Sequence, residues 1–146
     1  MPKVRLGVAK DFAVLRQLDA VSAVADAKDG QQFHVLQDDD VLDFFLDCEG
    51  LIVAEEDGQV VGYMLTHLVD RMHGGKRLAW IEHIGVHPDH RGKGVGTEML
   101  RFASDYYKGR AGCLHASIHP LNKASLRLFE SFGAECVERA LVFIDL

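Results

Sequence analysis

Three glycines alternate with other residues in the segment 91–96, which reads Arg-Gly-Lys-Gly-Val-Gly and lies between a strand-like run and a helical pattern. Glycine lets the backbone approach a ligand closely and turn several N–H groups toward one point. The first turn of a helix adds unpaired N–H groups and a partial positive charge. The segment therefore predicts an anion site suited to a pyrophosphate, to which Arg91 and Lys93 add full charge.

Two common nucleotide-binding patterns fit this segment poorly. A P-loop requires Ser or Thr after its Gly-Lys pair, whereas Gly94 follows Lys93 here. A dinucleotide-binding loop requires a third glycine where Thr97 stands, and a parallel strand–helix–strand unit. The strands before the segment are instead expected to form hairpins, so nucleotide binding is the weaker alternative.

A single carboxylate interrupts the apolar run that leads into the segment. Alternate residues of a strand share one face, which is expected to carry Trp80, Glu82, Ile84 and Val86. A carboxylate among three apolar side chains is costly to bury unless it is paired or used in chemistry. Glu82 is therefore the candidate general base, and the alternative is a glutamate at a sheet edge or in a salt bridge. His83 is expected on the opposite face, beneath a helix, in a structural role.

The segment 91–96 resembles the CoA-binding loop of the GNAT acyltransferases, in which Gln or Arg is followed by x-x-Gly-x-Gly or Ala. The run 84–88, Ile-Gly-Val-His-Pro, is similar to the family's strand before that loop. The stretch 119–133 is similar to a later family helix, with an Asn near its start and a Gly at its end. The order of the expected elements also agrees, so the resemblance covers nearly the whole chain.

The resemblance implies an N-acetyltransferase that uses acetyl-CoA as its co-substrate. The acetyl group would pass to a primary amine of a small molecule, peptide or protein by direct attack in a ternary complex. Glu82 would act as the catalytic base, since many family members place an acid–base residue there. Others use the position of Trp80, which cannot serve.

The same resemblance implies how the co-substrate is held. Backbone N–H groups of the glycine segment would bind the CoA pyrophosphate, and the strand ending at Val86 would pair with the pantetheine arm. The N–H of Ile84 or Gly85 would stabilise the oxyanion. Asn122 would lie near the same arm, although capping a helix would also explain it. The cofactor-binding residues implied are Ile84, Gly85, Val86, Arg91, Gly92, Lys93, Gly94, Val95, Gly96, Thr97 and Asn122.

One position departs from the family pattern. Many members carry a Tyr in the later helix that protonates the departing thiolate, and the matching residue here is Phe129. Tyr106 and Tyr107 belong to another expected helix and Tyr63 to a strand, so none is an evident replacement. The general acid is left unassigned.

Periodicity and turn signals predict one α+β domain over residues 1–146. The resemblance implies the GNAT acyl-CoA N-acyltransferase fold, a central, mostly antiparallel mixed sheet with helices on both faces. Strands are expected at 4–9, 51–55, 60–69, 78–86 and 113–118, and a final pair with 140–144 as its apolar core. Helices are expected at 12–26, after Asp40, at 95–107, and from Asn122 to a stop at Gly133; 30–37 is expected to be a loop. The first helix should point Val14, Leu15, Leu18, Val21 and Ala25 inward.

Composition limits the partners. The net charge of −6 argues against nucleic-acid binding, which needs clustered cations. The three cysteines lack C-x-x-C spacing and the eight histidines lack metal spacing, so no metal is expected. No signal peptide and no run of transmembrane length is visible, which favours a cytoplasmic location without membrane contact. Related proteins often dimerise, so a homodimer stays open.

The sequence leaves alternatives for the kind of acceptor and for whether the protein is an enzyme. Residues 29–70 contain no Lys or Arg and many acids, which suits a cationic amine acceptor or, more simply, a solvated helix face. A sensor that binds acyl-CoA without turnover is the second hypothesis. Glu82 favours an enzyme, whereas the absent Tyr leaves room for the sensor.

Overall fold

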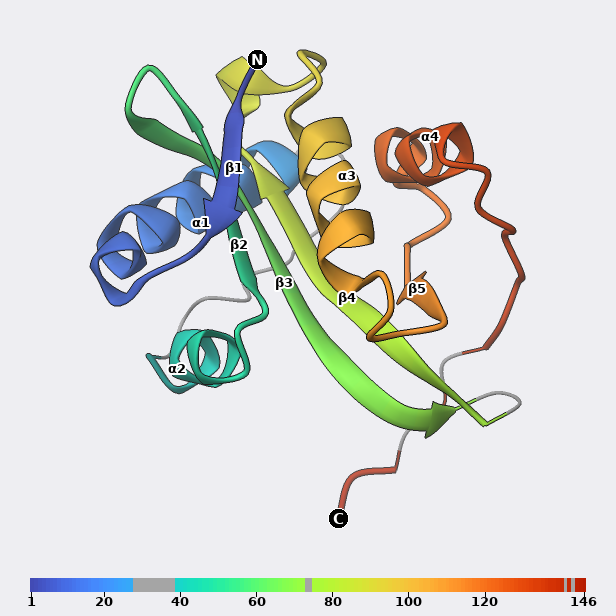
Figure 1. Cartoon of the computed structure of the whole chain (residues 1–146). Helices are drawn as coiled ribbons and strands as arrows, with labels where there is room; N and C mark the ends of the chain where they lie inside the picture. The colour runs from blue at the N-terminus through green and yellow to red at the C-terminus, as the bar shows by residue number, and fades with distance from the viewer. Residues whose placement is uncertain (28–38, 73–74, 141, 143) are drawn as a thin grey trace.

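The computed structural model describes residues 1–27, 39–72, 75–140, 142 and 144–146 (Figure 1). The expected loop at 30–37 and part of the turn at 73–76 lie outside the described residues. The elements are β1 (Lys3–Leu6), η1 (Ala9–Asp11), α1 (Phe12–Ala27), α2 (Asp39–Asp47), β2 (Leu51–Glu56), β3 (Gln59–Met72), β4 (Lys76–Val86), η2 (Pro88–His90), α3 (Val95–Tyr107), β5 (Cys113–Ala116) and α4 (Lys123–Ser131).

Five strands form one sheet in the order β1-β2-β3-β4-β5. The first four are antiparallel, and β5 runs parallel to β4. The hairpin between β2 and β3 turns at Asp57 and Gly58, whose φ angles of 50° and 78° match a tight hairpin turn. The expected α+β fold with a mostly antiparallel mixed sheet is confirmed.

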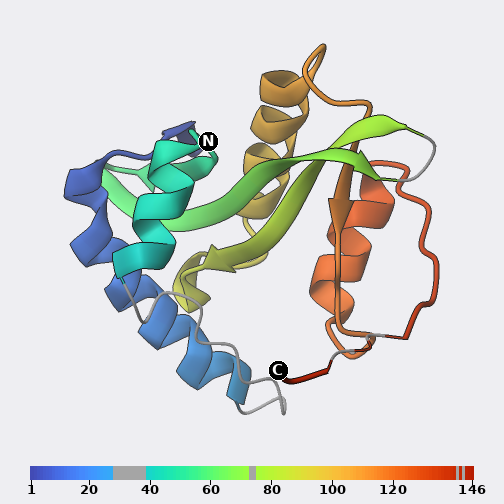
Figure 2. The ribbon, with the colours of Figure 1, turned by 90° about the horizontal axis from the view of Figure 1, so that it is seen from below.

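The sheet separates two apolar clusters. One joins Leu15 and Leu18 of α1 and Leu42 and Phe45 of α2 to the strands, and it includes Tyr63. The other packs α3 against the opposite face, with Met99 and Leu100 among its buried residues. In Figure 2, α1 and α2 lie on one side of the strands and α3 lies on the other side. Below, these are called the α1/α2 face and the α3 face.

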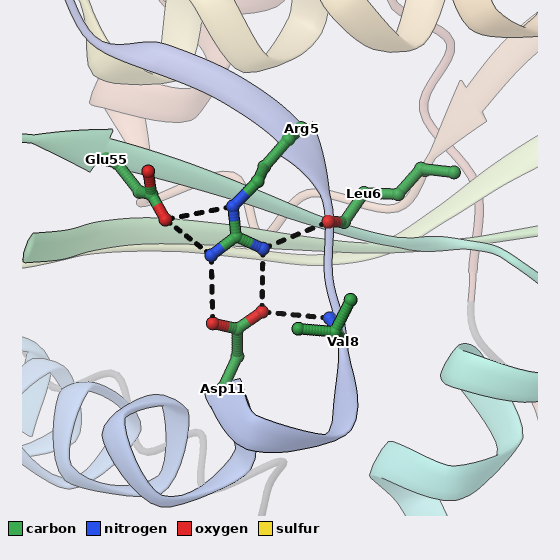
Figure 3. Close-up of polar contacts among 5 residues, drawn as sticks. All are labelled: Arg5, Leu6, Val8, Asp11 and Glu55. Carbon is green, nitrogen blue, oxygen red and sulfur yellow. Dashed lines mark hydrogen bonds and ion pairs between the residues drawn. The ribbon is translucent and has the colours of Figure 1, made fainter. Parts of the chain in front are cut away.

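An ion-pair network fixes β1 to the start of α1 (Figure 3). Arg5 donates two hydrogen bonds to the Asp11 carboxylate, of 2.8 and 3.0 Å, and also bonds Glu55 of β2. Asp11 accepts a further 2.8 Å bond from the N–H of Val8. Arg5 lowers the pKa of the buried Asp11 carboxyl below its usual value, because its hydrogen bonds stabilise the charged form.

The expected inward face of α1 is partly wrong. Leu15 and Leu18 are buried, but Val21 is 43% exposed. Two polar residues, Asp19 and Ser22, are buried instead, because they have polar partners on the sheet. Asp19 accepts a 2.8 Å bond from the Tyr63 hydroxyl, and Ser22 donates a 3.4 Å bond to the Val86 carbonyl.

The expected final strand pair is also wrong for the described residues. No strand follows α4 there, and Val142 and Ile144 are 82% and 83% exposed. Leu141 and Phe143 lie outside the described residues. A strand forms only where its backbone groups find a partner edge, and an apolar run does not by itself supply one. Asn122 caps α4 through a 3.1 Å bond from the N–H of Ser125, and Gly133 follows with φ 76°, both as expected.

Candidate active site

The glycine segment forms the turn between β4 and α3, at the end of the sheet where β4 stops (Figure 1). Gly92 and Gly94 have φ angles of 72° and 86°, a left-handed conformation that favours glycine. Both glycines are exposed, and among the described residues no atom beyond the chain neighbours lies within 4 Å of a Cβ placed at either position. The turn thus presents exposed backbone at the N-terminus of α3, as an anion site requires.

The remaining residues of the glycine segment differ in exposure and packing. Arg91 and Lys93 are exposed, and Arg91 donates a 3.0 Å bond from Nε to the Val86 carbonyl. Val95 is buried in the α3-face cluster, so only its backbone can meet a ligand. A Cβ on Gly96 would lie 3.1 Å from Leu128, so this glycine also allows α4 to approach α3.

A contact that was not predicted from the sequence joins the start of the glycine turn to the end of β2. Nδ1 of His90 lies 2.6 Å from Oε2 of Glu56 at the end of β2, and both side chains are partly buried. The pair joins residues far apart in the chain, and no local pattern marks it. It fixes the entrance to the glycine segment.

Among the described residues, no strand lies beside the edge of β4 that leads into the turn. The parallel ladder with β5 ends where Ile81 pairs with Ala116, and β5 itself ends there. Within the described structure, residues 83–86 therefore pair with β3 alone. This open edge contains Ile84, Gly85 and Val86, the residues expected to meet the pantetheine arm.

Gly85 is explained by packing. A Cβ at this position would lie 2.3 Å from Cε1 of Tyr63, so only glycine fits opposite that ring. Its pairing with Tyr63 is regular, and the register of β4 shifts instead at Glu82.

A β-bulge at Glu82 overturns the expected alternation. Leu65 pairs with His83 and Thr66 pairs with Ile81, so Glu82 is the extra residue. Ile84 and Val86 pack on the α3 face. Trp80 pairs with His67, whose ring contacts Phe44 and Phe45 of α2, so it belongs to the α1/α2 face.

Glu82 also lies on the α1/α2 face. Its Oε2 is 3.5 Å from Nε2 of His67, and its side chain is 47% exposed. The expectation that Glu82, Ile84 and Val86 share one face is therefore wrong, because the extra residue reverses the alternation. The Glu82 carboxylate lies beside the His67 imidazole and is half exposed to solvent, rather than buried among three apolar side chains.

His83 shares this face, contrary to the expectation that it lies opposite Glu82. Its ring lies 5.6 Å from that of Tyr63, which is buried beneath α1. The expectation that His83 lies beneath a helix agrees with this contact.

No tyrosine hydroxyl replaces the one missing at Phe129, whose side chain packs against the α3-face cluster. The three tyrosines of the chain all use their hydroxyls internally. Tyr63 donates to Asp19, Tyr106 donates to the Glu49 carbonyl, and Tyr107 lies 2.6 Å from the Thr66 hydroxyl.

Two absences hold for the described residues only. No group of His, Cys, Asp and Glu side chains there could hold a metal ion. Among the helices described, none combines the length and the apolarity needed to cross a lipid bilayer.

The model of the acetyltransferase (GNAT) family matches residues 15–134, which include the glycine segment, the bulged strand and α4. The chain belongs to the GNAT family. The mycothiol acetyltransferase of Streptomyces coelicolor is 28% identical over 129 residues, which are 85% of this chain and 40% of that protein. The L-amino acid N-acyltransferase of Escherichia coli is 35% identical over 85 residues, 57% of this chain and 48% of that protein.

This GNAT chain thus spans less than half the length of those two curated relatives. Among solved structures, an aminoglycoside N-acetyltransferase in complex with CoA superposes with a TM-score of 0.74. It covers 99% of both chains at 17% sequence identity, and such a likeness shows the fold alone.

Proposed function

We propose that this GNAT chain transfers an acetyl group from acetyl-CoA to a primary amine. The observation that carries the proposal is the open turn Gly92–Gly94 at the N-terminus of α3, directly beside an edge of β4 that has no neighbouring strand in the part of the chain that the structure describes. A pyrophosphate needs converging N–H groups, and an extended arm with amide groups needs a free strand edge. The two features lie next to each other in the chain and in the fold.

CoA would be held mainly by backbone. The N–H groups from Gly92 to Gly96 would bind the pyrophosphate, with Arg91, Lys93 and Thr97 at the rim of the same turn. Ile84, Gly85 and Val86 would pair with the pantetheine arm. Asn122 uses its Oδ1 for the cap of α4, and its Nδ2 group can donate to the same arm.

Glu82 would act as the general base. The ammonium form of the acceptor loses a proton to Glu82, directly or through water, and the neutral amine then attacks the thioester carbonyl carbon. A C–N bond forms, the C–S bond breaks, CoA leaves as the thiolate, and the attacking nitrogen gives up a second proton to solvent. Negative charge on the carbonyl oxygen would be stabilised by the N–H of Ile84 or Gly85. Solvent would protonate the thiolate, because no tyrosine hydroxyl of the chain is free for that step.

For the acceptor we propose only a chemical class, a primary amine. The E. coli relative is named for L-amino acids, which supports a small amine as acceptor. On this chain α2 adds four exposed carboxylates on the side of the sheet that carries Glu82, at Asp39, Asp40, Asp43 and Asp47. Asp39 already pairs with Arg16. The remaining negative charge favours a cationic amine.

The test is a free-thiol assay with acetyl-CoA and four amines: L-methionine, spermidine, an aminoglycoside and a lysine-containing peptide. We expect thiol release that depends on at least one amine. In Glu82→Gln, kcat should fall by about 10²–10⁴-fold while CoA affinity stays unchanged. Glu138→Gln, an exposed residue beyond α4, is the control.

The outcomes separate the hypotheses. Acetyl-CoA binding without transfer to any amine would favour the sensor. Full activity of Glu82→Gln would remove Glu82 from the mechanism. A thermal shift with ATP or NAD but none with acetyl-CoA would reject the proposal as a whole.

A further inference from the structure

The imidazole of His67 is held beside Glu82 by the structure around it. His67 lies on β3, opposite Trp80 on β4, and its Nε2 is 3.5 Å from Oε2 of Glu82. The rings of Phe44 and Phe45 lie 5.9 and 6.0 Å from the imidazole at steep angles. His67 is therefore fixed from α2, with only 25% of its side chain exposed.

Glu82 has much less to hold it. As the extra residue of the bulge it has no register partner of its own in the ladder with β3. Its side chain is 47% exposed, and a long exposed side chain loses entropy when it is confined to one rotamer. A base that must meet its acceptor in one orientation needs a neighbour to hold it there.

We propose that His67 is a positioning residue for Glu82 in acetyl transfer, an inference that rests on the proposed function. An N–H at Nε2 of His67 points the Glu82 carboxylate toward the α1/α2 face, where the acidic side chains of α2 draw in the amine. Phe44 and Phe45 hold the imidazole, the imidazole holds the carboxylate, and the bulge allows Glu82 to reach it.

The experiment separates the N–H of His67 from its ring packing. His67→Phe keeps an aromatic ring for Phe44 and Phe45 but loses the donor, whereas His67→Gln keeps a donor and loses the ring. Both variants are compared with wild type, Glu82→Gln and His67→Phe/Glu82→Gln. The control is Asp70→Asn, which removes an exposed ion pair with Arg77 between the same two strands. The measured quantities are kcat and KM for the best amine of the four-amine panel and KM for acetyl-CoA.

We expect His67→Phe to lower kcat about tenfold with KM for acetyl-CoA within about twofold. His67→Gln should stay within about threefold of wild type. In the Glu82→Gln background, His67→Phe should change kcat less than about twofold, because its effect passes through the carboxylate.

Three results would overturn the inference. They are wild-type activity of His67→Phe, a larger loss in His67→Gln than in His67→Phe, and a full tenfold effect of His67→Phe without Glu82. Each leaves the proposed function standing if wild type transfers acetyl. An inactive wild type with all four amines would reject the proposed function and this inference together.

Discussion

The hydroxyl of Tyr63 donates a 2.8 Å hydrogen bond to Oδ1 of Asp19, and both residues are buried. The bond joins α1 to β3 in the middle of the α1/α2 face. The ring of the same tyrosine lies against Gly85 and His83 of β4. Tyr63 therefore sets the position of α1 and the position of the strand that carries the candidate base.

Tyr63→Phe should destabilise the protein by about 1–3 kcal/mol, because a buried carboxylate loses one of its donors. Tyr106→Phe is the matched control, since its hydroxyl bonds an exposed residue's carbonyl, and it should cost less. Urea unfolding monitored by circular dichroism gives both values. Equal losses in the two variants would argue against a special role for the buried bond.

Gly85→Ala should destabilise by about 1–3 kcal/mol or more, because the added methyl would lie 2.3 Å from the Tyr63 ring. Gly112→Ala provides the comparison. Its methyl would lie 3.1 Å from Cδ and 3.3 Å from Cβ of Lys76, which needs a shift of only a few tenths of an ångström. The midpoints of thermal unfolding should fall for the first variant and stay nearly unchanged for the second.

Asp11→Asn tests the network around Arg5. The pKa of Asp11 is lowered in the folded state, so its stabilising effect is complete above the unfolded-state pKa of about 4 and is lost as pH falls through the folded-state pKa. We expect a loss of about 1–3 kcal/mol at pH 7. Below about pH 4 the difference between wild type and variant should shrink. Urea unfolding from pH 7 to pH 3 measures it, and a difference independent of pH would contradict the assignment.

Gly94→Ala and Gly58→Ala form a matched pair for the CoA turn. Both glycines have positive φ, 86° and 78°, and open space around them, so both substitutions impose the same kind of backbone strain. Each should cost about 1–2 kcal/mol of stability. Only Gly94→Ala should weaken CoA binding, measured by calorimetry, because Gly58 lies in the hairpin between β2 and β3. Equal CoA affinity in both would place the pyrophosphate elsewhere.

Local signals predicted much of this fold. The bounds of α3 agree with the expected 95–107, because the glycines before it mark its start. The Asn122 cap and the Gly133 stop are equally local. The family resemblance, carried by 91–96 and its flanking residues, is confirmed by the family match over 15–134.

The errors came from relationships beyond the local sequence. Strict alternation placed Glu82 with Ile84, since nothing in the residues marks a bulge. Val21 fits the helical period of α1 but is exposed, because Asp19 and Ser22 find polar partners on distant strands. The pairs His90–Glu56 and His67–Glu82 likewise depend on how the strands are arranged. The roles assigned to Glu82 and to the CoA-binding residues stay predictions.

Because Glu82 is an extra residue, the alternation of side chains between the two faces of the sheet changes phase at this point of β4. Before the bulge even-numbered Trp80 lies on the α1/α2 face, and after it even-numbered Ile84 and Val86 pack on the α3 face. Deleting Glu82 would make the pairs Thr66–Ile81 and Leu65–His83 consecutive in a regular ladder, so the other residues of β4 would keep their faces. The bulge therefore adds one carboxylate to the α1/α2 face without changing which side the apolar residues of the strand pack on.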